Sequence, residues 1–171
     1  MLPLIMMASV LVASCAHGET PVTSCRMQDQ YHVSADQHSA GVDGRGDQAM
    51  GFSHETAAHH FILLPDGGMI AVETSREHDD LTRDQIRMHL GHIAERFTAG
   101  DFDVPLFIHD RVPPGVPCMK AKHDAISYKY QETERGGEVR IKATDSDAIK
   151  AVHQFLVFQI QDHRTGDPIK E

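Results

Sequence analysis

The chain has 171 residues, a formal net charge of −9 and no tryptophan, and 13 of its residues are histidine. This length suits one domain with flanking segments. The negative charge argues against nucleic-acid binding, because contacts to phosphate need clustered lysine and arginine. The excess of histidine is the feature of the composition that most needs a chemical explanation.

The beginning of the chain predicts export and lipid attachment. Residues 1–12 are almost wholly apolar but too few to span a bilayer as a helix. They lead into Val12-Ala13-Ser14-Cys15, which resembles the lipobox of bacterial lipoproteins. In that family the cysteine is lipidated and becomes the first residue of the mature chain. An ordinary secretory signal with an incidental cysteine is the alternative, because no lysine or arginine precedes the apolar run.

We therefore expect a signal peptide at residues 1–14 and lipidation of Cys15, with the membrane as a partner through the lipid anchor. The expected location is the periplasmic face of the bacterial cell envelope. The outer membrane is favoured, because Ala16 and not an aspartate follows the cysteine. A protein partner in the envelope is also open, and the sequence does not identify it.

Residues 15–49 are polar, rich in Gly, Ser, Asp and Gln, and without an apolar period. They predict a flexible tether between the membrane and the domain. The tether contains Cys25, and the domain contains Cys118. In an oxidising compartment these two thiols could form a disulfide, and two unrelated thiols are equally compatible with the sequence.

Residues 50–171 predict one folded domain that begins with a β-hairpin. Two apolar runs, from His59 to Leu64 and from Met69 to Thr74, flank the turn sequence Pro65-Asp66-Gly67-Gly68. Alternation places His59 on the same face as the apolar residues of the hairpin and His60 on the other face. The next segment predicts a helix capped by Thr82 that ends near Ala99. Its apolar stripe consists of Ile86, Leu90, Ile93 and Phe97.

A connector from Asp101 to His123 follows, in which alternating apolar residues from Phe102 to Ile108 suggest an extended stretch. A second hairpin then turns at Arg135-Gly136-Gly137, and Asp145 or Ser146 caps the last helix. The apolar stripe of this helix consists of Ile149, Val152, Leu156 and Ile160.

The two halves of the domain resemble each other, each with the order strand, turn, strand, helix. The match aligns Gly67-Gly68 with Gly136-Gly137, and Leu90 with His153. One such unit cannot bury its own apolar face, so the two units are expected to join. The predicted fold class is α+β, with two strand-strand-helix repeats forming a four-stranded antiparallel sheet and two helices on one face.

Several histidines in this fold are candidate metal ligands. His89 and His92 lie one helical turn apart, and the repeat places His153 on the inner face of the partner helix. A rigid, proline-rich stretch adds His109 and Met119. The predicted metal ligands are therefore His89, His92, His153, His109 and Met119, and His59, His60 and His163 are outer candidates.

Copper is the favoured ion, because imidazole suits it and a thioether selects Cu(I). Zinc remains open, because carboxylates are plentiful. No HExxH, CxxC or CxxCH run is present, so no metal motif is strong by spacing alone. Each histidine taken singly could instead be a structural imidazole bonded to a carbonyl or another side chain.

Two other classes of function stay open. The first is a cofactor-free module that binds a ligand or a protein, for which an apolar patch on the open sheet face would be the sign. That patch would consist of Ile62, Leu64, Met69 and Ala71. The second is a small enzyme in which His109 or His89 acts as a general base. The sequence leans away from catalysis and contains no phosphate-binding loop or serine nucleophile on a glycine-flanked turn.

The run from Met50 to Asp167 also resembles a family of small uncharacterised bacterial exported proteins. The resemblance rests on His59-His60-Phe61, on the helix of His89 and His92, on the Pro113–Pro117 stretch with His109 and Met119, and on Val152-His153 through Asp167. Members of this family can carry the label aspartate carbamoyltransferase. The sequence does not support that chemistry, because it lacks a Ser-Thr-Arg-Thr phosphate loop. The resemblance implies the domain boundaries and no activity.

Overall fold

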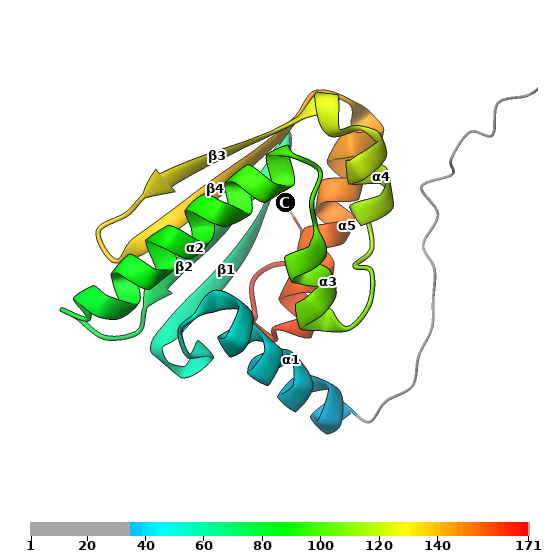
Figure 1. Ribbon diagram of the computed structural model, residues 1–171. Coiled ribbons are helices and arrows are strands. Elements are labelled where there is room, and N and C mark those ends of the chain that lie inside the picture. The colour runs from blue at the N-terminus through cyan, green and yellow to red at the C-terminus, as the bar shows by residue number, and fades with distance from the viewer. Residues whose placement is uncertain (1–34, 171) are drawn as a thin grey trace, which may run out of the picture.

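The computed structural model describes residues 35–170, which form an α+β domain as predicted (Figure 1). Four strands make one antiparallel sheet in the order β1-β2-β4-β3. The strands are β1 (Ala57–Leu64), β2 (Gly67–Thr74), β3 (Ile126–Glu132) and β4 (Gly136–Ala143). The two long helices, α2 (Asp80–Thr98) and α5 (Ser146–Asp162), cover the same face of this sheet, which confirms the predicted arrangement.

The two predicted repeats are related by a pseudo-two-fold axis between β2 and β4. Ile70 pairs with Val139, which is its own counterpart in the repeat. The β1–β2 and β3–β4 ladders correspond residue for residue, so that His59 matches Tyr128 and Phe61 matches Tyr130. We call β1, β2 and α2 the first unit, and β3, β4 and α5 the second unit.

Each helix packs on the hairpin of the other unit. α2 lies against β3 and β4, whereas α5 lies against β1 and β2. Matching glycines make room for leucines of these helices. A Cβ atom on Gly68 would lie 2.1 Å from Leu156 Cδ1, and a Cβ atom on Gly137 would lie 3.3 Å from Leu90 Cδ1. The exchange buries both apolar helix faces in one core and explains why one unit is insufficient.

Three of the four residues predicted for the buried stripe of α5, Val152, Leu156 and Ile160, are buried, and Ile149 is only partly buried. In α2, Ile86, Leu90, Ile93 and Phe97 are all buried, as predicted. The caps Asp79 and Asp145, and the leucines that lie against Gly137 and Gly68, align Leu90 with Leu156 and Phe97 with His163. His153 is then the counterpart of Arg87 and lies partly exposed at the margin of the stripe, which corrects its predicted inner position.

Aspartates cap both long helices. The Asp145 side chain accepts hydrogen bonds from the backbone N–H groups of Asp147 and Ala148, as one of the two predicted caps of α5. For α2 the cap is Asp79, which accepts from the N–H of Thr82 at 3.0 Å. Thr82 was the expected cap. It lies instead inside the first turn and is buried.

A helix was missed at the start of the domain. α1 (Ala35–Met50) occupies residues that the sequence assigns to the tether. Val42 is 1% exposed in α1, and Arg45 Nε donates to the Ile108 carbonyl oxygen at 2.8 Å. Three glycines lower the intrinsic helix propensity of α1, and its packing against the rest of the domain outweighs that loss.

The predicted connector also contains helices. Phe102–Ile108, expected to be extended, lies mostly in α3 (Asp103–His109), and α4 (Val116–Ala121) follows with Pro117 in its first turn. α1 and α3 lie side by side at one end of the domain (Figure 1). Two short 3-10 helices, η1 (His54–Thr56) and η2 (His123–Ala125), precede β1 and β3.

Several predictions fall on residues 1–34, which lie outside the described part of the chain. They are the signal peptide, lipidation of Cys15 and most of the tether, and they stay predictions. The structure has Cys118 in a disulfide whose other half is not among the described residues, so the proposed pairing with Cys25 also stays a prediction. Within residues 35–170, no helix has both the length and the apolar composition needed to cross a bilayer.

Candidate functional site

A small cavity between the sheet, α2 and α5 brings three histidines together. His59 comes from β1, His89 from α2, and His163 is the C-cap of α5. The cavity has a volume of about 60 Å³, and Met50 and Gln159 also line it. We call it the histidine cavity. Its other walls are apolar, and the lining contains no carboxylate and no thiol.

His59 lies at the centre of a row of rings. Alternation along β1 turns its side chain to the core face beside Phe61, as predicted. Its ring lies parallel to that of His163, with the centroids 5.8 Å apart, and it stacks on Phe52 at 6.3 Å. Burial lowers the pKa of His59 to about 4, and the positive charge that His89 would carry lowers it further. His59 is therefore neutral at neutral pH.

His89 lies at the boundary of the buried stripe of α2, as its spacing predicts. Its ring meets Phe52 edge-on, with the centroids 5.9 Å apart. Burial lowers the pKa of His89 to about 4, with a smaller contribution from His92. Phe52 thus contacts His59 and His89 and links the two rings in one apolar setting.

His163 closes the cavity at the end of α5. Its ring lies 5.6 Å from Phe61 and 5.0 Å from His109. Burial lowers the pKa of His163 to about 3, and the charges of protonated His109 and His59 act in the same direction. The Asp162 carboxylate opposes this shift without cancelling it.

Besides their lowered pKa values, the three cavity histidines share a lack of hydrogen bonds to their ring nitrogens within residues 35–170. Among the residues that the structure describes, none makes a hydrogen bond to a ring nitrogen of His59, His89 or His163, whereas the rings of His109 and His153 are bonded. All three residues are partly exposed, and none of their ring nitrogens is a fully buried atom without a partner. Three neutral imidazoles that line one cavity and have no hydrogen-bond partner in the described chain are candidates for binding a ligand.

Behind the cavity wall, a hydrogen-bonded chain fixes Gln159. Its side-chain amide hydrogen-bonds to His109 Nε2 at 3.0 Å, and His109 Nδ1 donates to Asp162 Oδ2 at 2.5 Å. Asp162 Oδ1 also accepts from Arg111 Nη2 at 2.9 Å and lies 2.8 Å from His38 Nε2. The pKa of Asp162 falls to about 2, because the bonds from His109 and His38 outweigh the opposing effect of burial. The carboxylate is therefore a fixed negative anchor for the chain.

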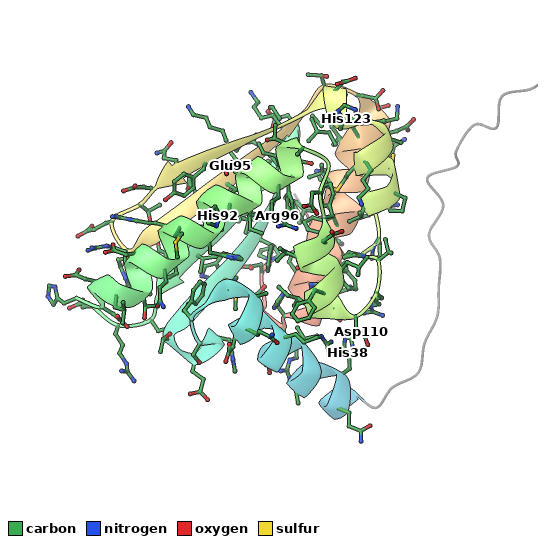
Figure 2. The ribbon with its side chains drawn as sticks, viewed as in Figure 1. His38, His92, Glu95, Arg96, Asp110 and His123 are labelled. Atoms are coloured by element: carbon green, nitrogen blue, oxygen red, sulfur yellow. The ribbon has the colours of Figure 1, made fainter. Side chains whose placement is uncertain are left out.

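The five predicted metal ligands do not converge. His89 lines the histidine cavity, whereas His109 lies behind Gln159 and is bonded at both ring nitrogens. Met119 belongs to α4, and its side chain is 1% exposed in the core. His92 is exposed on α2, where Glu95 and Arg96 follow it on the next turn (Figure 2).

His153 belongs to a different part of the surface. Its Nε2 bonds to the Leu64 carbonyl oxygen at 2.9 Å, and the residue lines an open apolar groove of about 510 Å³ along α5. Within residues 35–170, no three side chains of His, Cys, Asp or Glu already lie close enough together to hold one metal ion. The predicted helix-to-helix site is thus not assembled in the structure.

The sequence contained signals for some of the residues that do line the cavity. His59 falls on the buried face of its strand, and it was only an outer candidate, as was His163. Gln159 stands one turn after Phe155 in the buried stripe of α5, so a polar residue at a core position was its signal. Met50 was missed because it lies at the end of the unpredicted helix α1.

The open sheet face is only weakly apolar. Ile62, Leu64, Met69 and Ala71 lie on it as expected, and all four are partly buried. On β4 the same face continues with Glu138, Arg140 and Lys142.

Comparisons with protein families, curated proteins and solved structures found no match for this chain.

Proposed function

We propose that this protein binds a transition-metal ion, copper in the first place, in the histidine cavity. The observation that carries the proposal is the group of His59, His89 and His163, three neutral imidazoles without hydrogen-bond partners among the described residues, around one cavity. A metal needs the imidazole lone pair free of a proton, and the lowered pKa values keep it free well below neutral pH.

The missing hydrogen bonds also bear on how a site could assemble. The three rings surround the cavity without meeting at one point, so binding requires the side chains to rotate inward. No hydrogen bond within the described residues has to break for that rotation. Met50, at the end of α1, adds a thioether from the same wall.

The chemistry of the lining favours Cu(I) over zinc. Imidazole and thioether are ligands that suit Cu(I), which accepts low coordination numbers. Structural zinc sites are tetrahedral and commonly include thiolates or carboxylates, and the cavity lining has neither. The lining itself has no anion to offset the charge of a doubly charged ion, which would be costly to bury among apolar walls.

The proposed setting is the bacterial cell envelope. We place the domain at the periplasmic face on a lipid anchor at Cys15, with the outer membrane favoured, on the strength of the lipobox-like sequence. A protein at that location would bind copper outside the cytoplasm. Fatty-acid labelling of the parent and of Cys15→Ser tests the anchor separately from the metal site, since a parent without label contradicts the anchor alone.

The metal proposal is tested by competition with a coloured Cu(I) chelator. Loss of an outer-shell partner already costs 10–100-fold in metal affinity, so His59→Phe and His89→Leu should each lower the Cu(I) affinity by roughly 100-fold or more. His92→Ala and His153→Ala are matched controls outside the cavity and should bind as the parent does. A parent that takes up no Cu(I), or two cavity variants that bind it unchanged, would contradict the proposal.

A further inference from the structure

The open groove along α5 is an apolar surface that the histidine cavity does not explain. It has a volume of about 510 Å³, and its walls include Leu63 from the end of β1, Val157 and Phe158 from α5, and Ile169 near the end of the chain. Ile169 is 51% exposed there. Contiguous apolar surface of this kind commonly marks a binding site. Two points at which the chain is held to α5 identify an occupant.

The first point is the disulfide of Cys118. The chain has three cysteines, so the partner of Cys118 is Cys15 or Cys25. Lipidation would occupy the sulfur of Cys15, which leaves Cys25, and this step rests on the proposed lipid anchor. Cys118 Sγ lies 3.8 Å from the carbonyl oxygen of Asp147, in the first turn of α5. The disulfide therefore ties Cys25 to the beginning of α5.

The second point is the start of α1 at Ala35. In the first turn of α1, His38 Nε2 lies 2.8 Å from Oδ1 of Asp162, the last residue of α5. Residues 26–34 thus have to connect the two ends of α5, which its rise of 1.5 Å per residue places about 22 Å apart. The ten steps from Cys25 to Ala35 cover about 35 Å at full extension, which is enough for the span and leaves little length for a detour.

The shortest path between these two points crosses the groove. At 100° per residue, Gln154 and Phe158 project within about 20° of Asp147 around α5, and both line the groove. Asp162 lies about 60° from Asp147 on the same side of the helix. Arg111 also connects the groove to the α1 end, because its guanidinium lies 4.7 Å from the centre of the Phe158 ring and donates to Asp162.

The sequence of residues 26–34 suits an apolar groove. In an extended chain, alternate residues share a face, and one face of this segment would present Met27, Asp29, Tyr31 and Val33. The residues of the other face are all polar. Asp29 is the only carboxylate of the segment, and Lys170 in the groove lining has the opposite charge.

We propose that residues 26–34 lie in the groove along α5, held at one end by the Cys25–Cys118 disulfide and at the other by α1. We call this segment the strap. A segment fixed at both ends stays near its site at an effective concentration of about millimolar order, so modest contacts are sufficient to seat it. The groove is then an intramolecular docking surface that is occupied in the disulfide-bonded chain. This inference does not involve the copper site.

The first test maps the disulfide in the full chain. Cleavage after Glu19 and Arg26 separates the peptides of Cys15 and Cys25, so mass spectrometry of the unreduced digest identifies the partner of Cys118. A link from Cys25 is expected. A link from Cys15 would overturn both the strap and the lipid anchor, whereas a lipidated Cys15 beside an unlinked Cys25 would overturn the strap alone.

The second test identifies what fills the groove. In the parent, NMR should show nuclear Overhauser effects between the Tyr31 ring and the methyl groups of Val157 and Ile169, and Tyr31→Ser should shift these methyl resonances. His32→Ser, on the opposite face of the strap, is the matched control and should leave them in place. Absence of these effects would mean that the strap does not occupy the groove. Their appearance between differently labelled chains in a mixed sample would assign the groove to a second copy. Either result overturns the inference.

Protease cleavage separates a seated strap from a loose one. Chymotrypsin should cut after Tyr31 about tenfold more slowly in the parent than in Cys25→Ser, because cleavage of a seated segment requires local opening. A thiol reductant should bring the parent to the rate of Cys25→Ser and should leave the rate of that variant unchanged. Equal rates in the parent with and without reductant would show that the disulfide joins the two ends without seating the strap, and would overturn the inference.

Discussion

The two units of this domain share one backbone plan and fill matching positions differently. Where β3 meets α2, Tyr128 packs edge-on against Phe97, with the ring centroids 5.6 Å apart. Where β1 meets α5, the matching residues are His59 and His163, whose rings stack with their centroids 5.8 Å apart, and both line the histidine cavity. An aromatic pair at one contact thus corresponds to two imidazoles at the other, and Phe97 also borders the cavity.

The difference indicates which contact serves function. Buried imidazoles cost stability relative to aromatic side chains unless their polar atoms find partners. The fold can use aromatic rings at these positions, since Tyr128 and Phe97 do so where β3 meets α2. The polar choice where β1 meets α5 is therefore explained by binding more readily than by packing.

The largest expected effect comes from truncating Phe97, which packs against Tyr128 and also borders the histidine cavity. Phe97→Ala removes a side chain that is 2% exposed and contacts Phe102, Tyr128 and Phe155. Truncations of this kind cost about 3–5 kcal/mol. Urea denaturation of the metal-free domain measures the loss. A cost below about 1 kcal/mol would contradict the close packing of the Phe97 side chain.

The three cavity histidines should make the free energy of unfolding depend on pH. The cavity histidines are neutral in the folded state but protonate in the unfolded chain below pH 6.5. Their contribution is complete above pH 6.5 and is lost as the pH falls towards 4, because the unfolded state then binds more protons. Asp162 adds no loss in this window, because its contribution declines only below its ordinary pKa of 3.8.

His163→Phe should therefore flatten the stability curve between pH 6.5 and 4. After a discount for partial exposure, the parent should lose roughly 2 kcal/mol more than the variant over this range. His92→Ala, which removes an exposed histidine, should follow the parent curve. Denaturant unfolding at a series of pH values measures the difference. Parallel stability curves for the parent and His163→Phe would contradict the claim that His163 is held neutral in the folded state.

Gln159→Leu should change the stability of the metal-free domain by less than about 1 kcal/mol. Two effects oppose each other: the substitution removes a buried amide that is only partly satisfied, but it leaves His109 Nε2 without its partner. The small value contrasts with the large cost of Phe97→Ala. A loss above about 3 kcal/mol would show that Gln159 is chiefly a structural residue.

The smallest expected difference in stability is between variants of the two helix caps, because both caps are aspartates. Asp145→Ala should cost about 1 kcal/mol, because Asp145 accepts from two backbone N–H groups. Asp79→Ala should cost about half as much, since Asp79 accepts from one. Thermal melts of the two variants make the comparison, and the reverse order would contradict it.

Much of the fold followed from the sequence. Alternating apolar residues on both sides of Asp66-Gly67 and Arg135-Gly136 predicted two hairpins, and the periodic stripe from Ile86 to Phe97 predicted α2. These are local signals, because each depends on side-chain periods of one element. The short helices were missed for the converse reason. α1 and α3 are stabilised by packing against each other, and their own sequences carry weak signals.

Only part of the chemistry of the site could be predicted from the sequence. The sequence shows the excess of histidine, and it predicts both the boundary position of His89 and the inward direction of His59. Which histidines meet was decided by tertiary structure. The repeat as aligned from the sequence matches Leu90 with His153, whereas the structure matches Leu90 with Leu156. The packing of α5 on β1 and β2 sets this offset, and it places His153 at the margin of the core and His163 beside His59.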